Sequence, residues 1–197
     1  MKKPSGPHLP ELMGEAGESN ARLVDALNAL CPPPKAPPQL LRERLLATAV
    51  RPRLRFAPLF GALSELFELG DSDLAGIFER AADERAWIKS PVPGAQLLHF
   101  SAGPRAAGAD NGLLRLRAGA RFPTHRHLGA ERVLVLDGGY RDEQSGQIYR
   151  AGDVHEMPEG SSHAYTALPE RELLFAVSLV GGVDVEGFGR LSSSSEG

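Results

Sequence analysis

The chain has 197 residues, of which 42% are hydrophobic and 24% charged, and its formal net charge is −3. That length allows one barrel-sized core and one small additional unit, while the slight negative charge gives no general attraction to nucleic acid or to anionic membranes. A single cysteine, Cys31, excludes an internal disulfide and indicates a reducing compartment. Because the basic start precedes no apolar segment and no apolar run approaches about 18 residues, we expect a cytoplasmic protein without a secretory signal or membrane span.

The first 90 residues predict a helical amino-terminal region with a disordered start. Residues 1–18 show no hydrophobic periodicity. Helical spacing predicts a helix from Ser19 to Leu30, which the prolines after Cys31 end, and a second helix from Gln39 to Val50. Two more helices are predicted, one over 58–69 that ends at Gly70, and one capped by Asp71, Ser72 and Asp73 with Leu74, Ile77, Phe78 and Ala81 facing inward.

From residue 91 the periodicity changes from helical to strand-like. The alternation predicts that Val133 and Val135 face the interior, and that Leu134 and Leu136 face outward under the helices or a partner subunit. Many short strands separated by turn residues fit a double-sheet jelly roll. We therefore predict a β domain over 91–190 and a disordered tail over 191–197. The predicted strands cover 95–100, 112–117, 132–136, 139–142, 147–149, 154–157, 164–167 and 172–180.

Two glycine-bounded motifs within this β region carry the functional signal. The first is Gly119-x5-His125-x-His127-x3-Glu131-x6-Gly138, and the second is Gly152-x5-Pro158-x-Gly160-x2-His163. Residues two apart in a strand project to the same face, so both histidines of the first motif can point into a barrel. The glycines lie where tight turns or bulges need a residue that accepts a positive φ.

The double motif resembles that of the cupin superfamily, small β-barrels that hold a metal on three histidines and one glutamate. The resemblance implies a mainly β fold, a double-stranded β-helix or jelly-roll barrel, preceded here by the small α-helical region. It also implies that His125, His127, Glu131 and His163 bind one divalent transition metal. Imidazole and carboxylate ligands suit zinc, iron, manganese, nickel or copper better than calcium or magnesium. In a six-coordinate ion, four protein ligands would leave two positions open for a small molecule.

Residues 112–163 resemble in particular the cupin half of ChrR-type anti-sigma factors. Such proteins hold zinc in an amino-terminal helical domain through a His-x3-Cys-x2-Cys motif, and that domain occludes the sigma factor. In this chain residues 1–90 contain one histidine, His8, and one cysteine, Cys31, so the motif is absent. We expect no amino-terminal zinc, and expect any protein partner to be contacted by a preformed helical surface or by residues 1–18 ordering on binding.

Three functions are compatible with this sequence. The first is a regulatory or sensory cupin, whose helical region contacts a protein partner and whose metal responds to a small molecule or an oxidant. The second is a small dioxygenase that binds a chelating substrate at iron, and the third is an isomerase or a binding barrel.

No residue is assigned a catalytic role from the sequence. Tyr165 shares the parity of His163 and could reach the metal, although a buried tyrosine bonded to the backbone is the preferred interpretation. His155 lies outside the ligand pattern and is expected to be a neighbour of the site or a surface residue. Apolar residues on both faces of the strands predict a homodimer, because outward leucines need cover.

Overall fold

The structure, a computed structural model, describes residues 39–43 and 55–192. Residues 39–43 are helical, in agreement with the start of the helix predicted from Gln39; the remainder of that helix lies outside the described residues. The helix predicted over 19–30 also lies outside them, as do His8 and Cys31. Contacts divide the chain after Arg44, so residues 55–192 belong to one compact unit. Among the residues described, no helix has the length and apolar character needed to cross a membrane.

Short helices precede the sheets. The segment predicted as one helix over 58–69 forms a 3-10 turn, Ala57–Leu59, that continues into helix α4, Phe60–Phe67. Glu68 ends α4 by adopting a left-handed conformation with a φ of 55°, so the helix stops before the predicted Gly70. Helix α5 spans Asp71–Ala81, and a further 3-10 turn covers Glu84–Ala86.

The predicted cap of α5 is wrong by one residue. The N-cap is Gly70, which has no side chain to accept a hydrogen bond, and Asp71 is already the first helical residue. Asp71 and Asp73 instead lie in the first turn, where their negative charge complements the positive end of the helix dipole. The predicted inward face is confirmed for Leu74, Ile77 and Phe78, which are buried, whereas Ala81 is half-buried.

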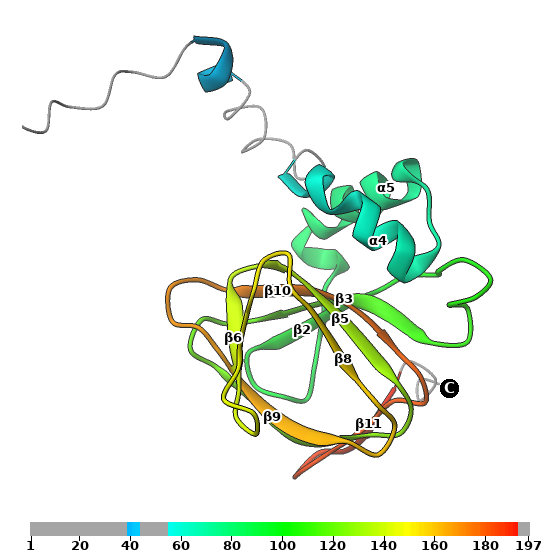
Figure 1. Ribbon diagram of the computed structural model, residues 1–197, viewed down its shortest axis with the longest axis vertical. Helices are drawn as coiled ribbons and strands as arrows, with labels where there is room; N and C mark the ends of the chain where they lie inside the picture. The colour runs from blue at the N-terminus through cyan, green and yellow to red at the C-terminus, as the bar shows by residue number, and fades with distance from the viewer. Residues whose placement is uncertain (1–38, 44–54, 193–197) are drawn as a thin grey trace, which may run out of the picture. The chain divides into compact units, whose positions relative to one another are not determined.

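Two antiparallel sheets face each other and enclose the core (Figure 1). The strands are Ile88–Lys89 (β1), Ala95–His99 (β2), Asp110–Leu116 (β3), Arg121–His127 (β4), Glu131–Asp137 (β5), Gly139–Asp142 (β6), Ile148–Arg150 (β7), Val154–Met157 (β8), Ser162–Ala167 (β9), Leu173–Leu179 (β10), Val183–Val185 (β11) and Gly189–Leu191 (β12). One sheet has the order β1-β2-β3-β10-β5-β8 and the other β12-β11-β4-β9-β6-β7. The mainly β jelly roll preceded by helices is therefore confirmed.

All the predicted strands are present, with ends shifted by no more than two residues. The sequence does not single out β1, β11 and β12, because two- or three-residue strands at or near a sheet edge show no clear alternation. The predicted strands also omit β4, although the motif spacing assumed that His125 and His127 lie in a strand, because Pro123 and the bulge beside it interrupt the alternation. Strand β12 ends at Leu191, the first residue of the predicted tail, so the ordered chain extends at least through this residue. The boundary predicted between residues 90 and 91 falls inside the compact unit and stays a prediction.

The alternation predicted for β5 is confirmed. Val133 and Val135 belong to the core between the two sheets, whereas Leu134 and Leu136 belong to a second core that includes Phe67 of α4. This second core lies between the helices and the outer face of the first sheet, and Figure 1 shows α4 and α5 over that sheet. The helices therefore supply the cover that the outward leucines need.

Candidate metal centre

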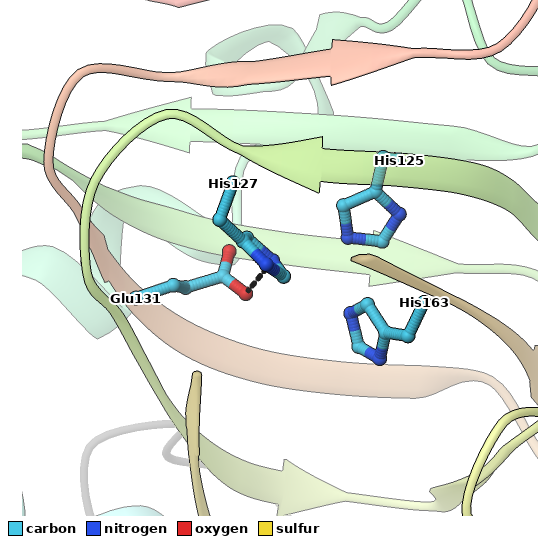
Figure 2. Close-up of side chains that lie close together, drawn as sticks. All are labelled: His125, His127, Glu131 and His163. Carbon is cyan, nitrogen blue, oxygen red and sulfur yellow. Dashed lines mark hydrogen bonds and ion pairs between the residues drawn. The ribbon is translucent and has the colours of Figure 1, made fainter. Parts of the chain in front are cut away.

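The four predicted metal-binding residues meet inside the barrel (Figure 2). His125 and His127 project from β4, Glu131 begins β5, and His163 projects from β9. All four side chains are buried, and they offer ligand atoms that lie within 4.8 Å of one another. The fold thus brings together the residues that the motif spacing selects, and this group could hold a metal ion.

A β-bulge in β4 directs Phe122 and His125 to the same side. Phe122 pairs with Tyr165 and His125 pairs with His163, so three steps along β4 match two steps along β9. Pro123 lies in the bulge, where its missing N–H costs no ladder hydrogen bond. Strict alternation would place Phe122 and His125 on opposite faces, so the bulge is what allows an aromatic side chain to pack beside the histidine, with ring centroids 5.0 Å apart.

The turn between β4 and β5 depends on Gly129. A Cβ atom at this position would lie 2.5 Å from the carbonyl oxygen of Val180, too close for any other residue without a backbone shift. The Val180 N–H, directly after β10, donates to the Ala130 carbonyl at 2.9 Å and holds the turn against the end of β10. This close approach sets the start of β5 and therefore the position of Glu131.

The four motif glycines have the positive φ angles that the sequence predicts. Gly119, Gly138, Gly152 and Gly160 all have positive φ, at 69°, 68°, 95° and 80°. Each lies in a turn that an ordinary residue would strain.

Each of the three histidines has its Nδ1 hydrogen fixed by a neighbour. The Nδ1–H of His125 donates to the Pro123 carbonyl at 3.0 Å, because a carbonyl oxygen can only accept. The Ser161 hydroxyl uses its hydrogen on the Pro158 carbonyl at 2.6 Å, so it accepts from the Nδ1–H of His127 at 3.0 Å. All of these partners come from the loops and strands around the two motifs.

The third histidine is fixed by a carboxylate. The Nδ1–H of His163 donates to Asp142 at 2.5 Å, a short, charge-assisted hydrogen bond. With the hydrogen on Nδ1 in every case, the three Nε2 atoms of His125, His127 and His163 carry lone pairs. Such outer partners fix the orientation and the tautomer of metal-binding histidines.

Two features of the cluster fit a bound cation. The Nε2 atom of His127 lies 3.1 Å from Oε2 of Glu131, the contact drawn in Figure 2, so two acceptors face each other unless a proton or a metal ion lies between them. The Nε2 atom of His163 is fully buried and has no hydrogen-bond partner. Buried polar atoms without a partner are costly, and a metal bound by these atoms would satisfy both features.

Local electrostatics keep His125 neutral and keep the carboxylates of Glu131 and Asp142 ionised. Burial, aided by the nearby His163, lowers the pKa of His125 to about 4, so this imidazole is neutral at neutral pH. Burial by itself raises the pKa of Glu131, but the hydrogen bond with His127 and the other histidines bring it below its ordinary value. Burial also opposes the charge of Asp142, yet bonds from Ser145 and His163 lower its pKa to about 2. Both carboxylates are therefore ionised.

Asp142 is the site residue that the sequence reading missed. Its other oxygen accepts from the Ser145 N–H and hydroxyl and from the Gln144 N–H, which fixes the carboxylate toward His163. A signal for it exists in the sequence: Asp142 shares the interior parity of Tyr140 on β6 and is followed by turn residues. Polar side chains on an interior parity are candidates for a buried hydrogen-bond network.

His155 lies close to the cluster. Of the two placements predicted for it, the structure thus supports the neighbour of the site and not the surface residue. Its Nδ1 atom is 2.9 Å from the Tyr140 hydroxyl, its ring stacks on Tyr149 at 4.1 Å, and its ring centroid is 5.6 Å from that of His163. Asp142, His155 and His163 form a second group whose ligand atoms lie within 4.8 Å of one another. This histidine therefore lies beside His163 and Asp142.

The cluster lies on the wall of a cavity of about 420 Å³ between the two sheets. His125, Glu131 and His163 line it, together with Tyr165. Tyr165 stacks on Phe122 at 5.1 Å, its ring lies 5.7 Å from that of His163, and burial raises its pKa well above the ordinary value. The structure therefore places Tyr165 beside the cluster as a neutral phenol.

The fold and this site define a cupin, and the chain belongs to the family described as the ChrR cupin-like domain, which matches residues 79–180, more than half of the chain. The recognition of that family from residues 112–163 is thus confirmed. No curated protein matches the chain.

Several solved structures resemble the chain in fold. The anti-sigma factor ChrR in complex with SigE, from Rhodobacter sphaeroides, matches with 27% identity and a TM-score of 0.46 over 54% of either chain. An acetylacetone dioxygenase from Acinetobacter johnsonii has 16% identity and a TM-score of 0.46 over 56% of this chain and 79% of its own. A protein of unknown function with a cupin-like fold, from Ralstonia eutropha JMP134, has 20% identity and a TM-score of 0.43 over 50% and 64%. The chain thus spans less than two thirds of the ChrR and Ralstonia chains.

Proposed function

We infer that this protein is a metal-binding regulatory cupin, in which His125, His127, Glu131 and His163 hold one divalent transition metal. The observation that carries this proposal is that three histidines with their hydrogens on Nδ1 and an ionised glutamate offer ligand atoms within 4.8 Å of one another. Imidazole and carboxylate donors in this number select zinc, iron, manganese or nickel. When bound, such an ion supplies a Lewis-acidic centre with room for a small-molecule ligand.

The residues around the cluster hold the histidine hydrogens and pack beside the rings. Asp142, Ser161 and the Pro123 carbonyl keep the histidine hydrogens on Nδ1, so the cluster is ready to bind a metal without rearrangement. The rings of Phe122 and Tyr165 pack on one side of the cluster. A small molecule or an oxidant that enters the cavity would therefore meet the metal directly, which is the event that a sensory site needs.

Membership of the ChrR cupin-like family supports a regulatory role in preference to catalysis. ChrR of Rhodobacter sphaeroides is an anti-sigma factor in complex with SigE. For this chain we propose a cytoplasmic location and a protein partner that contacts the helical region. That contact differs from a zinc-dependent one, because residues 1–90 lack the His-x3-Cys-x2-Cys motif.

Elemental analysis of the purified full-length chain tests the metal site. We expect about one transition-metal ion per chain, and loss of that metal in the His125→Ala plus His163→Ala double variant. His99→Ala serves as the matched control, because His99 pairs with Asp110 at 2.8 Å and is not part of the cluster. Retention of a full metal equivalent in the double variant would contradict the proposed ligands.

A small dioxygenase is the second candidate, because the cluster opens onto a cavity large enough for a substrate. Oxygen uptake by the iron-loaded chain with small diketone or thiol substrates separates the two functions. The regulatory proposal expects no uptake above that of the His125→Ala plus His163→Ala variant. Substrate-dependent uptake that requires the intact cluster would establish the enzyme instead.

A further inference from the structure

The chain segment that joins the helices to the barrel is itself part of the cavity wall. After the 3-10 turn that follows α5, the chain passes Trp87 and enters β1. Residues 88–91, here called the strap, follow in succession, and all four line the same cavity as the metal cluster. A molecule that fills this cavity therefore contacts the covalent connection between the two parts of the unit.

Few bonds hold the strap to the barrel. Its strand β1 lies at the edge of the first sheet and pairs with β2 at two positions, Ile88 with Leu97 and Lys89 with Gln96. The Ser90 N–H adds one hydrogen bond, to the Ala95 carbonyl at 3.1 Å. Short edge segments of this kind open locally at a lower free energy than the interior of a sheet. The strap is therefore a part of the cavity wall whose opening an occupant can readily change.

The two ends of the strap are anchored in different cores. Val92 follows it, is completely buried and belongs to the core between the two sheets. Trp87 precedes it and belongs to the core beneath the helices, together with Leu74 and Phe78 of α5. A change in the position of the strap is thus passed directly to a residue that packs with the helices.

Arg115 of β3 ties this anchor to both parts of the unit. Its guanidinium lies over the Trp87 ring, 4.4 Å from the centroid, and donates to Glu84 and to Gln96, each at 2.9 Å. The Trp87 indole N–H donates to the Ala81 carbonyl, the last residue of α5, at 3.0 Å. The Arg115 side chain is only 12% exposed, so solvent screens these contacts little. Contiguous side-chain contacts of this kind can carry coupling between two sites.

We propose that the strap communicates the occupancy of the cavity to the helices. A molecule in the cavity packs against the closed strap and holds it on β2, and through Trp87 and Arg115 it also holds the end of α5. Because the occupant contacts the closed strap and not the open one, it shifts the population toward the closed state. The proposal rests on the proposed regulatory function and adds how the site acts on the surface that a protein partner contacts.

A covalent occupant tests this inference without knowledge of the natural ligand. Leu191 lines the cavity from β12 of the facing sheet and is half-buried, so Leu191→Cys in a Cys31→Ser chain places one thiol in the wall. A benzylthio label fills part of the cavity, and a methylthio label adds little volume. We expect the benzylthio label to slow amide hydrogen exchange at least about fivefold both in residues 88–91 and in residues 71–87, the low end of the range for coupled sites.

The matched control is Arg190→Cys in the same background, because Arg190 is the preceding residue of β12 and is exposed. The benzylthio label at this position should leave exchange unchanged in both segments. Mass spectrometry of the full-length, metal-loaded chain measures the labelling and the exchange.

A second variant separates transmission from contact. Arg115→Ala should preserve the effect of the Leu191→Cys label on residues 88–91 and abolish it in residues 71–87. Arg132→Ala, which removes an exposed ion pair with Glu156 on the same sheet, should preserve both effects.

An effect of the Leu191→Cys label confined to residues 88–91, no effect in either segment, or faster exchange in both would overturn the inference. So would an effect on residues 71–87 that survives Arg115→Ala unchanged. Metal content is measured on the same chains, so a chain that binds its metal but shows no transmission overturns this inference alone. A chain without metal overturns the proposed function, while the label still decides whether the strap and α5 are coupled.

Discussion

At the scale of single residues, Asp142 shows how one unforeseen side chain completes the site. Asp142 is the last residue of β6 and is buried. One oxygen of its carboxylate accepts three hydrogen bonds from residues 144 and 145, and the other accepts from His163. The motif spacing selects the histidine, but this carboxylate fixes which nitrogen of the ring faces the cluster.

The substitution Asp142→Asn should weaken metal binding by roughly 10- to 100-fold, the range typical for loss of an outer partner. The amide oxygen would stay with the Ser145 and Gln144 donors, so the amide NH2 would face Nδ1 of His163 and force the ring hydrogen onto Nε2. Competition with a metal-binding dye measures the change. Glu143→Gln is the matched control, because Glu143 pairs with Arg121 on the surface, and an equal loss in that variant would contradict the prediction.

Removal of the metal should make stability depend on pH through His125. The unfolded imidazole binds its proton near pH 6.5 and the folded one only near a pKa of about 4, so the metal-free chain loses stability as the pH falls from 6.5 toward 4. Between pH 7.5 and pH 5 the loss from this group is about 2 kcal/mol. Urea unfolding in the presence of a chelator measures it, and the loss should shrink in His125→Gln.

At the scale of elements, the helices ahead of the barrel are part of its packing. Phe67 and Phe78 are almost completely buried in the core that also holds Leu98 and Leu134 of the first sheet. An element that covers a sheet face in this way stabilises the barrel even though it contributes nothing to the metal cluster.

Phe78→Ala should therefore destabilise the whole unit by about 3–5 kcal/mol, the cost of truncating a buried phenylalanine. Chemical unfolding followed by tyrosine fluorescence reports on the barrel, where Tyr140, Tyr149 and Tyr165 lie. Glu79→Ala, at an exposed position of the same helix, should change the stability little. A barrel signal unaffected by Phe78→Ala would indicate that the helices and the sheets unfold separately.

At the scale of the whole molecule, the need for a partner subunit is reduced by the helices. They cover the outward leucines of β5, and the outer face of the second sheet carries polar residues, among them Arg121, Arg126 and Asp184, all exposed. The homodimer stays a prediction, supported by exposed apolar residues such as Val154 and Val180. Light scattering at high protein concentration tests it, and a strict monomer would contradict it.

The metal stoichiometry of the full-length chain tests the amino-terminal region. We expect one ion per chain, all of it removed by the His125→Ala plus His163→Ala substitutions, because residues 1–90 contain a single histidine and a single cysteine. A second, tightly held zinc ion that survives those substitutions would restore a zinc-dependent contact with a sigma factor.

Much of the fold and of the candidate site is encoded locally. Alternation places Val133 and Val135 inside and Leu134 and Leu136 outside, and a spacing of two residues directs His125 and His127 to one face. The positive φ of the motif glycines could be predicted because it is a local property of the backbone. These features need no knowledge of distant residues. Together with the resemblance of the two motifs to those of cupins, they let the sequence by itself predict the jelly roll, its family and the set of three histidines and Glu131.

Tertiary structure alone decided the features that depend on two distant segments. The bulge at Pro123 is defined by the pairing of β4 with β9 and places Phe122 beside His125 against the alternation. Asp142 becomes a partner of His163 because β6 pairs directly with β9, although β7 and β8 separate these two strands in the sequence. Neither contact has a fixed spacing along the chain, since it is the register between strands, set by the packing of the whole barrel, that brings such residues together.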